Sequence, residues 1–78
     1  MAKKVIIYST PVCPYCIRAK QFLKDNNVAF EDNDVSTDRA KADEMMRKSG
    51  QMGVPVLDIE GEIIVGFDKE KIKSALGI

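Results

Sequence analysis

The chain has 78 residues, 45% of them hydrophobic, and its 12 Lys and Arg residues are balanced by 12 Asp and Glu residues. This length predicts a single domain, residues 1–78, that buries only about 60% of the surface exposed by its unfolded chain. No basic stripe or aromatic-plus-basic stretch suggests nucleic-acid binding, and no apolar run approaches the length of a membrane span.

The first third of the chain predicts a strand followed by a helix. Residues 4–8 form a short β-branched and aromatic run that is typical of a buried strand, and the Ser-Thr-Pro sequence after it ends the strand. From residue 13 to about residue 26 the apolar side chains recur at helical spacing. Cys16, Ala19 and Leu23 then share one face of this helix.

The middle of the chain predicts a second strand and a second helix. Residues 28–35 have the composition of a strand. The Ser-Thr-Asp sequence that follows supplies capping residues for a helix that runs to about residue 49. We expect Met45 and Met46 to fill the core from this helix, and Gly50 to end it.

The last third predicts a hairpin and a final helix. Residues 55–59 and 62–65 are two strand patterns joined by a Glu-Gly turn. Asp68 can cap a helix that turns Ile72 and Ala75 inward. The order β-α-β-α-β-β-α predicts an α/β protein with one mixed four-stranded sheet, parallel in its first β-α-β unit and antiparallel in its last pair.

The two cysteines, Cys13 and Cys16, fall where the first strand meets the first helix. A disulfide between them would close too short a loop to add much stability. A helix N-terminus carries partial positive charge and free N–H groups. We therefore expect the Cys13 thiolate to be stabilised, with a pKa below the free-thiol value of about 8.5, although the chain has no histidine to act as a base. Pro14 suits the first helical turn, and Cys16, one turn deeper, should be less ionised.

The difference in expected ionisation between Cys13 and Cys16 predicts thiol–disulfide exchange. Cys13 attacks a substrate disulfide, Cys16 displaces the reduced product, and an external reductant resets the pair. The alternatives are a structural cysteine pair, an iron–sulfur or metal carrier that uses Cys13 across a dimer, and a non-catalytic binding module. A closed zinc site needs four ligands, which one chain without histidine does not offer. We expect a monomer with no bound cofactor or metal, and a cytoplasmic location because no signal-peptide pattern follows the basic start of the chain.

The segment from Tyr8 to Lys20 resembles the active-site segment of dithiol glutaredoxins, including their usual Cys-Pro-Tyr-Cys sequence. Gly53-Val54-Pro55 resembles the loop that carries the cis-proline of thioredoxin-fold proteins. Residues 65–68 lie where this family has its second substrate-contacting turn. The resemblance covers nearly the whole chain and is closest to short bacterial and archaeal glutaredoxin-like proteins, including those similar to ribonucleotide-reductase electron donors. It implies the thioredoxin fold and a protein-disulfide reductase that acts on client proteins.

The resemblance also implies which residues contact the substrate. In this family the residue before the cis-proline offers its backbone groups to the substrate or to glutathione. The sequence alone leaves open whether this X–Pro bond is cis, and the resemblance implies that it is. Tyr15 either flanks the substrate groove or shields the disulfide. The implied substrate-binding residues are Thr10, Pro14, Tyr15, Gln51, Val54, Pro55, Gly66, Phe67 and Asp68.

Two positions depart from the family's pattern for binding glutathione. Thr10 stands where glutathione-using relatives commonly have Lys or Arg, and Val65 replaces the first glycine of the second turn. Because glutathione carries two carboxylates, loss of a cation removes a charge-assisted hydrogen bond. Gln51 is placed to contact glutathione, and Arg18 or Lys20 could compensate for the missing cation. We expect weak glutathione binding, and the candidate reductants are glutathione and a thioredoxin-reductase-like flavoenzyme.

Overall fold

The computed structural model describes residues 4–51 and 53–78; the start of the chain, residues 1–3, and Met52 lie outside the described residues. The elements follow the order expected from the sequence. They are β1 (Val5–Ser9), α1 (Pro14–Asp25), β2 (Glu31–Asp34), α2 (Arg39–Ser49), β3 (Val56–Ile59), β4 (Glu62–Val65) and α3 (Lys69–Leu76).

The strands form one mixed four-stranded sheet in the order β2-β1-β3-β4. β1 pairs in parallel with β2, and the pairs β1–β3 and β3–β4 are antiparallel. The Glu60-Gly61 turn has positive φ at both residues, 52° and 91°, as a tight hairpin requires. The predicted α/β class and mixed sheet are therefore confirmed.

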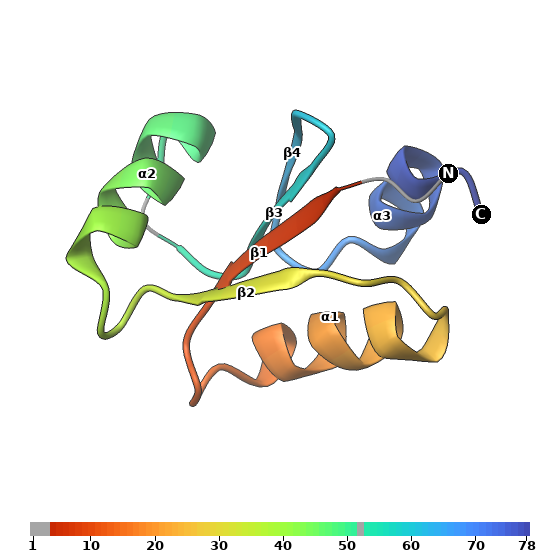
Figure 1. Ribbon diagram of the computed structural model, residues 1–78, viewed down its shortest axis with the longest axis horizontal. Helices are drawn as coiled ribbons and strands as arrows, with labels where there is room; N and C mark the ends of the chain where they lie inside the picture. The colour runs from red at the N-terminus through yellow and green to blue at the C-terminus, as the bar shows by residue number, and fades with distance from the viewer. Residues whose placement is uncertain (1–3, 52) are drawn as a thin grey trace.

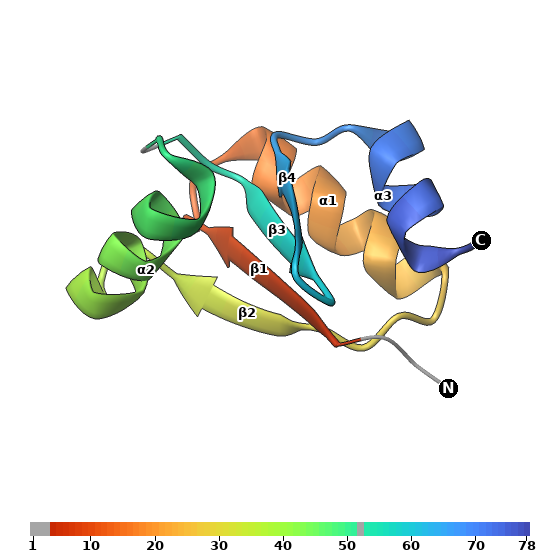
Figure 2. The ribbon, with the colours of Figure 1, turned by 90° about the horizontal axis from the view of Figure 1, so that it is seen from above.

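Helices cover both faces of the sheet, α1 and α3 on one face and α2 on the other (Figures 1 and 2). Alternation along the strands sends side chains to two apolar clusters. The larger cluster joins Val5 and Ile7 to α1 and α3, and the smaller joins Tyr8 and Val56 to Met45 of α2. β1 is thus packed on both faces, and its end leads directly into the segment that carries the cysteines.

Two expectations about local structure are wrong in detail. β2 covers only Glu31–Asp34, because Val28 and Phe30 pack against the larger cluster before the strand begins. Met46 is 41% exposed, whereas Met45 is 1% exposed. Consecutive residues of an α-helix point about 100° apart, so the narrow face that α2 turns to the sheet covers only one of the two methionines.

A polar cluster ties the C-terminal half of α2 to the sheet. The Tyr8 hydroxyl donates a hydrogen bond to the Glu44 carboxylate and accepts one from the Lys48 ammonium at 2.8 Å. Lys48 also forms a 2.7 Å ion pair with Asp58 of β3. Because Tyr8 is fully buried, its hydroxyl needs these partners. The cluster holds the last turn of α2, just before the chain turns at Gly50 towards the proline loop.

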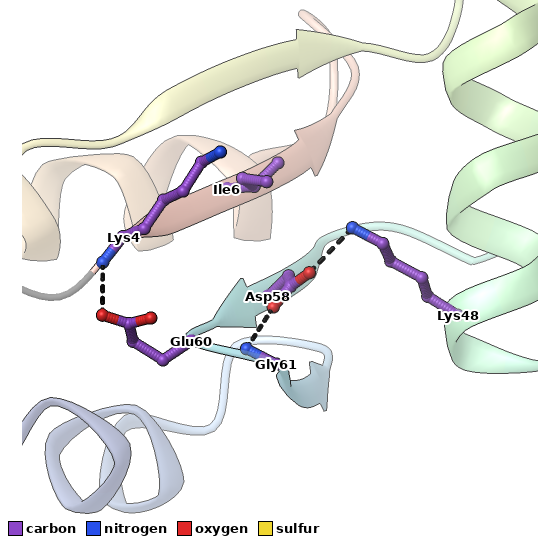
Figure 3. Close-up of a pocket in the computed structure, with 6 residues that line it drawn as sticks. All are labelled: Lys4, Ile6, Lys48, Asp58, Glu60 and Gly61. Carbon is purple, nitrogen blue, oxygen red and sulfur yellow. Dashed lines mark hydrogen bonds and ion pairs between the residues drawn. The ribbon is translucent and has the colours of Figure 1, made fainter.

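Figure 3 shows a pocket of about 300 Å³ beside this cluster, lined by Lys4, Ile6, Lys48, Asp58, Glu60 and Gly61. The Asp58 carboxylate accepts hydrogen bonds from the Lys48 ammonium and, at 2.8 Å, from the Gly61 backbone N–H. Lys4 and Ile6 mark the beginning of β1, whereas Cys13 follows its end. The pocket therefore lies at the opposite end of β1 from the cysteines, and its polar groups connect α2 to the hairpin.

We expect Asp58→Asn to lower the free energy of unfolding by about 1–2 kcal/mol at neutral pH. Burial acts to raise the pKa of Asp58, but the hydrogen bonds from Lys48 and Gly61, and the charges of Lys48 and Lys4, outweigh it and lower the pKa. A carboxyl with a lowered folded pKa stabilises the fold above its unfolded pKa of about 3.9, and this stability is lost as the pH falls through the folded pKa.

Urea unfolding of the wild type and the variant should therefore give midpoints that converge as the pH is lowered from about 7 towards 3. A difference that stays the same size over this range would contradict an electrostatic role for Asp58.

Candidate active site

Cys13 is the N-cap residue of α1. Its backbone is extended, with φ −87° and ψ 115°, and its sulfur accepts a hydrogen bond from the Cys16 backbone N–H at 3.3 Å. Pro14 is the first helical residue, and the first turn carries no acidic side chain. The Cys13 sulfur is thus held at the positive end of the helix, where a thiolate is stabilised.

The two sulfurs differ in how easily they ionise. Burial acts to raise the pKa of Cys13, but hydrogen bonds from the Cys16 thiol and from the Cys16 and Tyr15 backbone N–H groups, with the charge of Lys20, outweigh it and lower the pKa. Cys16 is fully buried. Burial first, and then its hydrogen bond to Cys13, raise the pKa of Cys16 to about 11. Both thiols are free, so Cys13 is the sulfur suited to attack first.

The proline loop faces Cys13, and its X–Pro bond has the cis form that the resemblance implied. The Val54–Pro55 peptide bond is cis. The Cys13 thiol points to the Val54 carbonyl oxygen, 4.0 Å from the sulfur. Pro55 is buried, and its carbonyl oxygen accepts a hydrogen bond from the Gly66 N–H at 2.8 Å. This bond connects the second turn to the loop beside the cysteine.

The other residues of the second turn are engaged elsewhere. The Phe67 ring packs edge-on against Phe22 of α1, with centroids 6.1 Å apart. The Asp68 carboxylate accepts a hydrogen bond from the Lys71 N–H at 3.2 Å and so caps α3. Among the three substrate-binding residues implied here, Gly66 alone is linked by hydrogen bond to the proline loop in the described part of the chain.

Thr10, Tyr15 and Gln51 also have defined positions. The Thr10 carbonyl oxygen accepts a hydrogen bond from the Cys13 N–H at 3.4 Å. The Tyr15 ring is 59% exposed, and the Arg18 guanidinium lies 5.7 Å from its centroid. The Gln51 amide is bound to Gly53 on both sides, accepting from its N–H at 2.6 Å and donating to its carbonyl oxygen at 3.0 Å. This amide therefore stabilises the loop.

Apolar side chains are exposed around the cysteine. Val12 is 85% exposed and Ile17 is 56% exposed, on either side of Cys13 in the chain. Exposed apolar residues gathered at one place are typical of a surface that contacts another molecule.

The interpretation of the sequence missed the pairing of Lys20 with Asp32. The Lys20 ammonium lies 2.9 Å from an Asp32 carboxylate oxygen, and its charge acts on both sulfurs. The available signal in the sequence was the position of Lys20 four residues after Cys16, which places the Lys20 charge near the sulfurs on one helix face.

Residues 4–51 and 53–78 contain neither a clustered metal site nor a membrane-spanning helix. No group of three or more His, Cys, Asp or Glu residues there could hold a metal ion. No helix in the same ranges has the length and apolar character needed to cross a membrane.

Comparison with known proteins identifies the family. The glutaredoxin family model matches residues 5–64. The chain is 50% identical over 66 residues to a glutaredoxin-like 8.6 kDa protein of the Clostridium pasteurianum rubredoxin operon, covering 85% of this chain and 88% of that protein. It is 39% identical over 64 residues to glutaredoxin 3 of Escherichia coli K12, covering 82% of this chain and 77% of that protein.

Solved structures confirm the thioredoxin fold. The thioredoxin-like protein BC3987 superimposes with a TM-score of 0.87 at 38% identity, covering 92% of this chain and 99% of the other. The glutaredoxin of Archaeoglobus fulgidus superimposes with a TM-score of 0.87 at 27% identity, covering 94% of this chain and 85% of the other. Because the family model spans most of the sequence and curated relatives match it along most of their length, the chain belongs to the glutaredoxin family.

Proposed function

We propose that this protein is a dithiol electron carrier that reduces disulfides of client proteins, with Cys13 as the nucleophile and Cys16 as the resolving thiol. The family supplies the general reaction class, thiol–disulfide oxidoreduction. The finer proposal is carried by one observation: the Cys13 sulfur lies at the N-terminus of α1 and accepts the Cys16 N–H, whereas Cys16, one helical turn deeper, is fully buried.

The proposed reaction has two exchange steps. The Cys13 thiolate attacks one sulfur of the client disulfide, a mixed disulfide forms, and the other client sulfur leaves as a thiolate that takes up a proton. Cys16 then loses its proton and attacks the Cys13 sulfur. The Cys13–Cys16 bond forms, and the second client sulfur leaves and is protonated. The client gains two electrons and two protons, and the carrier is oxidised.

The surroundings of Cys13 suit an extended protein segment. The Val54 carbonyl oxygen lies beside the sulfur and can accept a backbone N–H of the client. The exposed side chains of Val12, Tyr15 and Ile17 add apolar area for the residues that flank the client disulfide.

We propose a thioredoxin-reductase-like flavoenzyme, rather than glutathione, as the reductant. Thr10 supplies no positive charge near Cys13, and the Gln51 amide is bound to Gly53. Of the two cations that could compensate, Arg18 stacks on Tyr15 and Lys20 is paired with Asp32. Binding the carboxylates of glutathione would therefore compete with interactions already formed.

We expect glutathione to bind weakly. Isothermal titration at physiological salt should give a dissociation constant above the micromolar range, because Thr10 carries no charge and the two candidate cations, Arg18 and Lys20, are engaged by Tyr15 and Asp32. Thr10→Lys should tighten binding by about tenfold, the gain that one charge-assisted hydrogen bond of roughly 1.4 kcal/mol provides. Micromolar binding by the wild type would contradict this expectation.

A two-arm assay tests the proposed function. One arm couples reduction of a protein disulfide to NADPH and thioredoxin reductase, and the other to NADPH, glutathione and glutathione reductase. We expect turnover at least about tenfold faster in the first arm. Faster turnover in the second arm would reject the proposed reductant, and no turnover in either arm would reject the electron-carrier function.

A further inference from the structure

Lys20 lies on the same side of α1 as the cysteines, four residues after Cys16 and seven after Cys13. Residues with these spacings are neighbours along one helix face. The Lys20 ammonium is 2.9 Å from one oxygen of Asp32, and the Ser9 hydroxyl donates to the other oxygen at 2.7 Å. Each oxygen of the Asp32 carboxylate therefore has its own hydrogen-bond partner. One of these partners, Ser9, is 1% exposed, so it fixes the carboxylate and the ammonium paired with it.

The sheet brings this triad, Ser9, Asp32 and Lys20, together from three elements. Asp32 of β2 is in register with Ile7 of β1, which points into the core under α1. Partners in register on adjacent strands point to the same face, and so does Ser9, two residues after Ile7. Asp32 and Ser9 therefore lie on the face of the sheet that α1 covers; Figure 2 shows where β1, β2 and α1 lie.

Lys20 of α1 lies between the sulfurs and the acidic side chains of β2 in the network of charges. α1 contributes Lys20, whose charge acts on both cysteines. β2 contributes Asp32 and Asp34, and the Lys20 charge also acts on Asp34.

The remaining neighbours of the sulfurs are uncharged. Just after β1, the backbone of Thr10 hydrogen-bonds to the Cys16 thiol. The proline loop contributes Val54 and Pro55. Asp32 and Asp34 of β2 are therefore the acids that interact with the cation acting on both sulfurs.

We propose that Lys20 supplies the positive charge that stabilises the sulfur anions during thiol–disulfide exchange, and that Asp32, held by Ser9, limits how much of that charge reaches them. This inference rests on the proposed roles of Cys13 and Cys16 and deepens them. Lys20, Asp32 and Ser9 are positioning residues, because they act through the sulfurs and not on the client.

The resolving step depends most on this charge. Cys16 must release its proton to water before its sulfur can attack Cys13, and burial makes that thiolate costly. While the Cys13–Cys16 bond forms and the Cys13–client bond breaks, the negative charge moves from Cys16 to the departing client sulfur. A cation one helical turn from Cys16 stabilises the starting anion.

The experiment uses the reduced protein and 2,2′-dipyridyl disulfide, which is uncharged and so is not itself attracted by Lys20. Stopped-flow absorbance separates release of the first thiopyridone, by attack of Cys13, from release of the second, by attack of Cys16. Both rates are measured across pH for the wild type and for Lys20→Met, Lys20→Arg, Asp32→Asn and Lys24→Met. Lys24→Met is the matched control, since it removes the same charge one turn farther along α1.

We expect Lys20→Met to move the pH profile of the second phase to higher pH and to slow it roughly three- to tenfold at neutral pH, as a rise of about half to one pKa unit requires. Asp32→Asn should move the profile to lower pH. Lys20→Arg should restore the wild-type profile, and Lys24→Met should leave it unshifted.

Equal profiles for Lys20→Met and the wild type, or equal shifts for Lys20→Met and Lys24→Met, would overturn the inference. Shifts of Lys20→Met and Asp32→Asn in the same direction would also overturn it, because loosened packing, unlike charge, moves both the same way. Absence of the first phase in the wild type would instead reject the proposed function of Cys13.

Discussion

Cys13→Ser should reduce the rate of client disulfide reduction to that of the uncatalysed reaction. The remaining thiol, Cys16, is fully buried, and burial, the largest cause of its raised pKa, persists in the variant, so at neutral pH it offers neither access nor a useful thiolate fraction. The measurement is NADPH consumption with thioredoxin reductase and a protein disulfide. Retained turnover by this variant would reject Cys13 as the nucleophile.

The same substitution should leave the fold intact, which makes the kinetic result interpretable. The Cys13 side chain already accepts a hydrogen bond from the Cys16 N–H as the N-cap of α1. Serine is among the preferred N-cap residues and can accept the same bond. Thermal unfolding followed by circular dichroism should therefore show a midpoint no lower than that of the reduced wild type. A large fall would show that the sulfur is needed for stability.

Cys16→Ser should stop reduction of protein disulfides while trapping a mixed disulfide on Cys13. The attack by Cys13 does not need the second sulfur, but release of the client does. Incubation with an excess of a disulfide-containing protein should give a covalent adduct, seen by non-reducing electrophoresis and by mass spectrometry. Dithiothreitol should reduce the mixed disulfide and so separate the client from the protein.

The matched control is the double variant Cys13→Ser/Cys16→Ser, which should form no adduct. Adduct formation by Cys16→Ser should persist below the ordinary thiol pKa, because the pKa of Cys13 is lowered. Continued release of reduced client by Cys16→Ser would show that an outside thiol resolves the mixed disulfide, and would reject the resolving role of Cys16.

The local signals in the sequence were sufficient for the elements and the cysteine pair. The β-branched run of β1 and the caps at Asp38 and Asp68 predicted their elements because such preferences depend on residues close in the chain. The position of Cys13 at a strand-to-helix junction likewise predicted its lowered pKa, since a helix N-terminus stabilises a thiolate wherever the helix lies.

Met46 and β2 show where local signals fail. The spacing of Met45 and Met46 allows either to face the core, and the width of the contact between α2 and the sheet decides that only Met45 does. Val28 and Phe30 have strand composition, yet they pack against the core ahead of β2. In both cases burial depends on partners distant in sequence.

The sequence by itself determined the order of the elements, the position of the cysteine pair at a strand-to-helix junction and the departures at Thr10 and Val65 that weaken the case for glutathione. Only the tertiary structure decided that the Val54 carbonyl oxygen faces Cys13, that Gln51 is bound within its own loop, and that Asp32 meets Lys20. The physical reason is the separation along the chain of the residues that make each contact. Helix caps and strand patterns arise from near neighbours, whereas these contacts require the register of β1 with β2 and the packing of α1 on the sheet.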